Sequence, residues 1–274
     1  MSGYTLTTAE RIIKAKIDLY NPYPFYSCIL MNMKVENVEH EHIPTMGVNQ
    51  YGDLYWNKKF VDGLSKDDLT FVLCHEVLHV ALLTFQREGS RDRGLWNVAT
   101  DILINNILCE EGLTPIKNCL KPNYKNVFEF KGKNGKKVSI DVSGKTAEQV
   151  YDELIYNCEV IKYSVSMQGD GSYDGEIGKH LKGDSDGTGK SQNKGKDESS
   201  VKANENAWKR KAVEAVTQAK MRGNVSASME RMIENMLEPT IDWRSKLFAY
   251  LTKDLPVDYT MRTPSRRSFA TGFY

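Results

Sequence analysis

The sequence lacks several features that would assign the chain to a specialised class. Its five cysteines are odd in number and include no C-x-x-C pair, so they predict neither a disulfide framework nor a cysteine zinc site and favour a reducing, cytoplasmic compartment. Net charge is almost absent: 37 basic residues oppose 36 acidic ones, leaving +1 and no global attraction to nucleic acid or anionic membrane. The N-terminal stretch has no apolar signal core. No apolar run is long enough to cross a bilayer, because the longest candidate is interrupted by two histidines.

Composition divides the 274 residues into three parts. We expect a core over residues 1–157, a flexible polar insert over 158–206 and a helical C-terminal segment over 207–274. The insert is predicted because Gly, Ser, Asp, Lys and Asn dominate it and large apolar residues are almost missing.

Hydrophobic spacing and turn signals predict an α+β fold with a small mixed or antiparallel sheet. The expected strands are 25–35, 46–48, 53–56, 127–130 and 137–140. The expected helices are 7–20, 65–89, 95–109, 146–156, 207–221, 227–237 and 241–251. Tyr51, Tyr55 and Trp56 could line a peptide cleft at a strand edge, although such aromatic residues are more often ordinary sheet packing.

The stretch from Ser65 to Gly89 carries the strongest functional signal. Ser65 is suited to cap a helix, and Gly89 is suited to a left-handed stop. Between them the apolar residues surround the helix almost completely, so we expect it to be buried. His75 and His79 lie four residues apart and therefore share a face.

His-Glu-x-x-His on a helix is typical of zinc hydrolases. In that chemistry the two histidines bind zinc and the glutamate acts on a metal-bound water, which assigns His75 and His79 as ligands and Glu76 as the catalytic base. Two core histidines satisfied by ordinary hydrogen bonds are the alternative. A buried helix favours the metal, because unpaired polar groups are costly there.

The next predicted helix offers a third ligand. Asn97, Asp101 and Asn105 recur every four residues and form a polar stripe on an otherwise apolar helix. Such a stripe could bring a carboxylate, Asp101, to a buried metal, with Asn97 and Asn105 supporting it by hydrogen bonds. It could also be the solvent-facing side of an amphipathic helix, although the apolar neighbours leave little surface for water.

Four segments carry a resemblance to a known family: HEVLH, WNVATDILIN, LEPTIDWRSKL and TPSRRSF. With them the chain resembles bacterial and phage putative metallopeptidases that carry a von Willebrand factor A-like domain at the C-terminus. The resemblance implies a zincin-like catalytic domain in which His75, His79 and Asp101 bind Zn²⁺ and Glu76 is the base. It also implies association with a MoxR-type AAA+ ATPase. The sequence ends at Tyr274, about where the von Willebrand-like part would begin, so we expect that module to be absent.

The expected activity is hydrolysis of peptide bonds in a protein or peptide substrate, with no nucleic acid and no membrane as partner. Two alternatives belong to other classes. The chain could be a non-catalytic metal-binding adaptor that works with a AAA+ ATPase or another protein. Two histidines and one carboxylate could also hold iron in an oxygenase, although the adjacent glutamate fits hydrolysis better.

Overall fold

The computed structural model describes residues 6–38, 43–117, 119–131, 136–157, 198–223, 229–231 and 233–234. All of these residues belong to one compact unit, residues 1–237. The helices are α1 (Thr8–Asp18), α2 (Pro24–Met31), α3 (Lys58–Gly63), α4 (Lys66–Ala81), α5 (Thr84–Arg87), α6 (Arg93–Glu110), α7 (Ala147–Asn157) and α8 (Glu198–Met221). The strands are β1 (Val35–Val38), β2 (Met46–Val48), β3 (Leu54–Asn57), β4 (Val127–Lys131) and β5 (Lys137–Asp141). The α+β prediction is confirmed.

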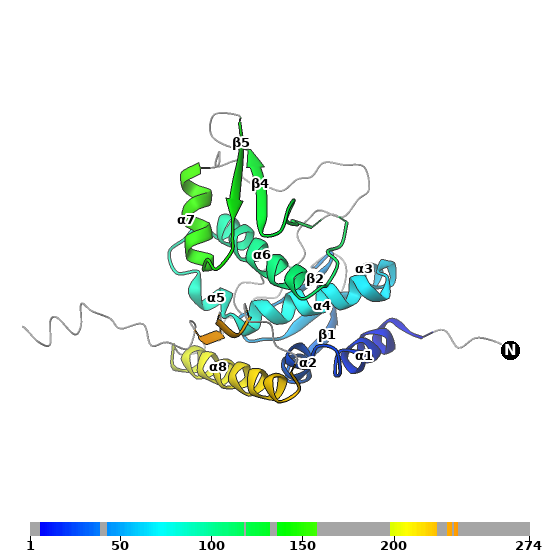
Figure 1. Ribbon diagram of the computed structural model, residues 1–274. Coiled ribbons are helices and arrows are strands. Elements are labelled where there is room, and N and C mark those ends of the chain that lie inside the picture. Colours follow the sequence, from blue (N-terminus) through cyan, green and yellow to red (C-terminus); the bar gives the residue numbers. More distant parts are fainter. Residues whose placement is uncertain are drawn as a thin grey trace, which may run out of the picture. The chain divides into compact units, whose positions relative to one another are not determined.

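Helix α4 lies at the centre of this unit (Figure 1). It packs against α6 on one side and against α1, α2 and α8 on another, and strand β2 also contacts it. Its residues from Phe71 to Ala81 are buried without a break. This all-round burial explains why a nearly uniform apolar sequence is stable as a helix here.

The three-stranded sheet has the order β1-β3-β2. Strand β1 pairs with β3 in parallel, and β2 pairs with β3 antiparallel through the predicted turn at residues 49–52. The second predicted hairpin is also present, as β4 and β5, and packs near α7. Both hairpin predictions are confirmed.

The prediction of a strand over residues 25–35 is wrong. Residues 24–31 form helix α2, which begins with Pro24 in its first turn and ends before the short strand β1. Phe25, Tyr26, Ile29 and Leu30 are buried, whereas Met31 is exposed, and this spacing is helical. An apolar run of this length has no clear period, so the contacts of α2 with α4 and α8 decide its conformation.

The helix predicted between Ser65 and Gly89 is interrupted. Helix α4 ends at Ala81, Leu83 adopts a left-handed conformation with φ of 53°, and α5 starts at Thr84. Gly89 is left-handed as expected, at φ of 60°, but it follows α5.

The C-terminal predictions are only partly covered by the described residues. The helix expected from Ala207 begins earlier, at Glu198, and ends at Met221 as predicted. Residues 229–231 and 233–234 are helical, in agreement with the helix expected at 227–237. The helix expected at 241–251 and most of the polar insert lie outside the described residues, so the predicted domain limits stay a prediction.

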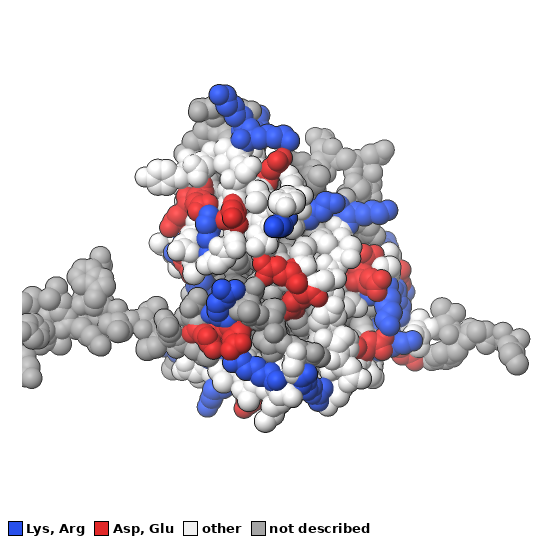
Figure 2. All heavy atoms as spheres, viewed as in Figure 1, with Lys and Arg blue, Asp and Glu red and all other residues white. Residues whose placement is uncertain are grey.

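No helix in the described part of the chain is long and apolar enough to cross a membrane. Acidic and basic side chains are interspersed over the face shown in Figure 2.

Candidate metal centre

Helix α4 presents His75, Glu76 and His79 to the interior. Its start is fixed by Ser65, whose hydroxyl accepts from the Asp68 backbone N–H while the Asp68 carboxylate accepts from the Ser65 N–H. This capping box sets where the first turn begins. His75 and His79, which follow further along the helix, are both at most 1% exposed and lie one above the other.

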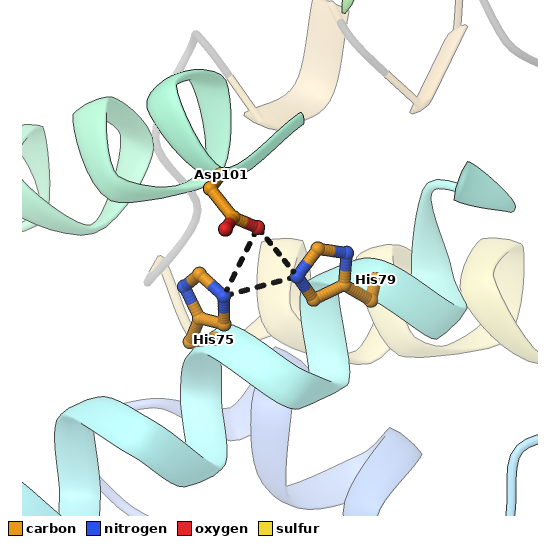
Figure 3. Close-up of side chains that lie close together, drawn as sticks. All are labelled: His75, His79 and Asp101. Atoms are coloured by element: carbon orange, nitrogen blue, oxygen red, sulfur yellow. Dashed lines mark hydrogen bonds and ion pairs between the residues drawn. The ribbon is translucent and has the colours of Figure 1, made fainter. Parts of the chain in front are cut away.

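Helix α6 brings Asp101 to the two imidazoles (Figure 3). The Nε2 atoms of His75 and His79 lie 2.9 Å apart. Asp101 Oδ1 lies 3.5 Å from Nε2 of His75 and 3.1 Å from Nε2 of His79. Asp101 is only 7% exposed, so the alternative of a solvent-facing stripe does not apply to it. Within the described residues this trio is the group whose ligand atoms lie close enough together to hold a metal.

The outer nitrogen of His75 is held by Asn105. Its Nδ1 lies 2.9 Å from Asn105 Oδ1, while Asn105 Nδ2 donates to the backbone oxygen of Leu120 at 2.7 Å. The amide orientation is thus fixed by Leu120, and an amide oxygen can only accept. Nδ1 of His75 therefore carries the proton, and the lone pair of Nε2 points at Asp101 and His79.

The outer nitrogen of His79 is held by Thr84. The Thr84 hydroxyl donates its proton to the backbone oxygen of His79 at 3.2 Å. A lone pair of Thr84 Oγ1 can therefore accept from Nδ1 of His79, also at 3.2 Å. Thr84 is itself fixed, because its backbone oxygen accepts from Nε1 of Trp96 at 2.9 Å. The second imidazole therefore also directs an Nε2 lone pair inwards.

Asn97 supports Asp101 more weakly. Its Nδ2 lies 3.4 Å from Asp101 Oδ2, near the limit of a hydrogen bond. Its buried Oδ1 has no hydrogen-bond partner among the described residues.

Glu76 is buried beside this trio with an exposure of 0%. Neither of its carboxylate oxygens has a hydrogen-bond partner of normal geometry in the described part of the chain. Burial raises the pKa of Glu76 to about 8, and the Asp101 charge adds to that effect; the His75 charge and the nearby Val48 backbone amide oppose it. A buried carboxyl group without a strong partner requires an explanation other than packing.

The pKa shifts of Asp101, His79 and His75 show that these three side chains interact strongly. Burial opposes ionisation of Asp101, yet its bonds to His75 and His79 lower its pKa to about 2. Burial and the His75 charge lower the pKa of His79 to about 4, against the influence of Asp101. His75 is also penalised by burial, but Asp101 and Glu76 raise its pKa above the ordinary value.

These groups fit a bound divalent metal. Two imidazole lone pairs that face each other repel unless a proton or a cation lies between them. Ligand atoms held at about 2.0–2.2 Å from a tetrahedral zinc are separated by roughly 3.3–3.5 Å. The observed separations of 2.9, 3.1 and 3.5 Å are close to that value, and the donor set of two nitrogens and one carboxylate oxygen suits zinc.

Comparison with protein families is consistent with this arrangement. The model of a protein family described as "Putative metallopeptidase domain" matches residues 7–273, which is nearly the whole chain. The chain belongs to this family. Comparisons with curated proteins and with solved structures gave no significant match.

The structure brings together every predicted ligand. His75, His79 and Asp101 converge, Glu76 lies beside them, and Asn105 contacts His75. Their roles as ligands and base stay a prediction. Thr84 was missed as a supporting residue; the only signal was a polar residue at the end of an apolar helix.

Of the aromatic residues considered for a peptide cleft, Tyr55 and Trp56 lie in the interior. Tyr55 is 4% exposed and clusters with Val38 and Ile43, whereas Trp56 is 7% exposed and belongs to the main core. Both act as sheet packing.

Proposed function

We propose that this protein is a zinc-dependent peptidase with a zincin-like site. The observation that supports it best is the convergence of two imidazole Nε2 atoms and one carboxylate oxygen beside the buried Glu76, which has no hydrogen-bond partner of normal geometry among the described residues. Two histidines and Asp101 would leave one of four zinc positions open, as catalytic zinc sites do.

A zinc ion held by His75, His79 and Asp101 would lower the pKa of a coordinated water from about 15.7 towards about 7 and polarise a substrate carbonyl. Glu76 takes the water proton on its carboxylate and delivers it to the departing amine. The pKa of about 8 belongs to the protein without a cation, and a nearby positive charge favours the ionised base. Asn105 and Thr84 hold the proton of each imidazole on Nδ1, so both Nε2 lone pairs would face the ion.

The edge of strand β2 supports a peptide as the substrate. Asn49 N–H donates to Asp53 O and Asn57 N–H donates to Thr45 O, so alternate residues of this segment bond to β3. Met46 and Val48 therefore direct their backbone groups to the opposite edge, where Val48 approaches Glu76. No second strand in the described part of the chain pairs with this edge. Met46 and Val48 are at most 1% exposed, so an extended peptide could add there as a strand next to the base only once this edge becomes accessible.

Metal analysis and a peptide-library digest test this proposal together. Elemental analysis of protein purified without added metal should give one zinc per chain, and iron instead would favour an oxygenase. Wild type should cleave library peptides. Glu76→Gln should retain the zinc and lose hydrolysis, whereas His75→Ala and Asp101→Ala should lose the zinc. Proteolysis retained by Glu76→Gln would refute the assignment of the base.

A second function is favoured by the burial of the site. His75, Glu76 and His79 are at most 1% exposed, which leaves little room for a substrate carbonyl to reach the metal. The protein could then be a metal-binding adaptor for a AAA+ ATPase of the MoxR type. Stoichiometric zinc without cleavage of any library peptide by wild type, alone and with the ATPase, would favour the adaptor.

A further inference from the structure

The turn between β2 and β3, residues 49–52, is ordered from within by Asn49. Asn49 Oδ1 accepts from the backbone N–H groups of Tyr51 and Asp53, each at 2.9 Å. Its Nδ2 donates to the Asp53 carboxylate at 3.0 Å, and Gly52 N–H donates to Asn49 O at 3.0 Å. These bonds fix the shape of the turn but not its position in the molecule.

Its position is fixed by side chains from distant parts of the sequence. Trp208 of α8 donates from Nε1 to the backbone oxygen of Tyr51 at 3.0 Å. Asn204, one turn earlier on α8, and Gln86 of α5 each donate to the backbone oxygen of Gln50 at 3.2 Å. The carbonyl groups of the turn are thus held by two helices.

The contact between Gly52 and Trp208 requires glycine. Gly52 has φ of 84°, which L side chains rarely adopt, and a Cβ atom at this position would lie 2.2 Å from a ring carbon of Trp208. Trp208 is 4% exposed, and the Lys211 ammonium lies 4.0 Å from the centre of its ring. The indole is therefore packed against bare backbone and cannot shift without moving the turn.

The turn continues directly into the edge of β2. Val48 precedes Asn49, and its backbone amide is the group of β2 that approaches Glu76. A shift of the turn would move this amide and the peptide groups beside it relative to the base.

We propose that Trp208 is a positioning residue for the peptide substrate: it holds the β2–β3 turn against α8 and so fixes the β2 edge on which the substrate would lie. This inference rests on the proposed peptidase function. It gives α8, which follows the polar insert, a part in substrate binding without any contact with the metal ligands.

Kinetics of the zinc-loaded full chain test the proposal. Trp208→Ala should raise KM for a cleaved peptide about tenfold, change kcat less and leave one zinc per chain. Trp208→Phe keeps a ring but loses the donor to Tyr51, so its KM should fall between those of wild type and Trp208→Ala. Gly52→Ala should raise KM as well, through the clash with the indole.

Val216→Ala is the matched control, because Val216 is a buried residue eight positions further along α8 that does not reach the turn. Its KM should equal that of wild type. An unchanged KM in Trp208→Ala, or an equal rise in Val216→Ala, would overturn the proposal. If Trp208→Ala fails to fold, the KM values of Trp208→Phe and Gly52→Ala test the proposal instead.

Hydrogen exchange separates this inference from the proposed function. In zinc-loaded protein, amides of residues 46–57 should exchange faster in Trp208→Ala than in Val216→Ala. If wild type cleaves no peptide, the peptidase proposal fails, and hydrogen exchange alone tests whether Trp208 holds the β2–β3 turn. Equal exchange in the two variants would show that Trp208 does not hold the turn.

Discussion

At the scale of single residues, the decisive feature is that each histidine has a partner for its outer nitrogen. Asn105 and Thr84 contact Nδ1 of His75 and His79, and these contacts leave both Nε2 lone pairs for a metal. The spacing of His75 and His79 puts the rings on one face, but spacing alone does not select the tautomer.

Replacing these partners should weaken zinc binding. We expect Asn105→Leu and Thr84→Val, which keep the side-chain size, to lower zinc affinity by about 10–100-fold, whereas Thr84→Ser should retain most of it. Asn97→Leu should have a smaller effect, because its amide is 3.4 Å from Asp101. Competition with a chromophoric chelator measures each affinity. Wild-type affinity in Thr84→Val would show that its hydroxyl does not orient the ring.

At the scale of elements, local signals predict capped helix starts well, whereas α8, expected from Ala207, begins at Glu198. Thr7, Ser65 and Thr146 each begin a helix with a capping box. The end of α4 was placed too late, because the break at Leu83 depends on Thr84 turning back to His79 and on Trp96 binding Thr84. A short sequence window contains the cap residues but not those partners.

The cap of α4 should contribute measurably to stability. Ser65→Ala removes the acceptor for the Asp68 N–H, so the free energy of unfolding should fall by about 1 kcal/mol, and Ser65→Thr should preserve most of it. Urea denaturation of the metal-free proteins measures the difference. A loss as large in Ser65→Thr as in Ser65→Ala would mean that the hydroxyl is not the stabilising group.

At the scale of the whole molecule, the burial of Glu76 links folding to pH and to metal. The unfolded chain releases the Glu76 proton near its ordinary pKa of 4.5, whereas the folded, metal-free protein holds it until about pH 8. Between these values the folded state binds more protons, so the free energy of unfolding attributable to this group falls as pH rises.

Metal-free Glu76→Gln should therefore be more stable than metal-free wild type at neutral pH. The two should be nearly equal near pH 4.5, and the gap should widen up to about pH 8, reaching as much as several kcal/mol. Thermal or urea unfolding across this range, with a chelator present, provides the measurement. A gap that is constant with pH would contradict the raised pKa.

Zinc should stabilise the folded protein by mass action. At a free concentration of one hundred times the dissociation constant we expect a gain of about 2.7 kcal/mol in wild type and in Glu76→Gln. His75→Ala, which lacks a ligand, should show no gain. Unfolding with and without added zinc tests this expectation, and a full gain in His75→Ala would place the ion elsewhere.

The sequence by itself determined the α+β class, the capped helices, the two hairpins and the candidates His75, Glu76, His79 and Asp101, because these follow from residue types at short, regular spacings. Only the tertiary structure decided that residues 24–31 are helical, that Thr84 supports His79 and that Trp208 reaches the β2–β3 turn. Those outcomes depend on contacts between residues far apart in the chain or across a helix break. The spacing of hydrophobic residues within a short window does not predict such contacts, because they form only when the elements pack together.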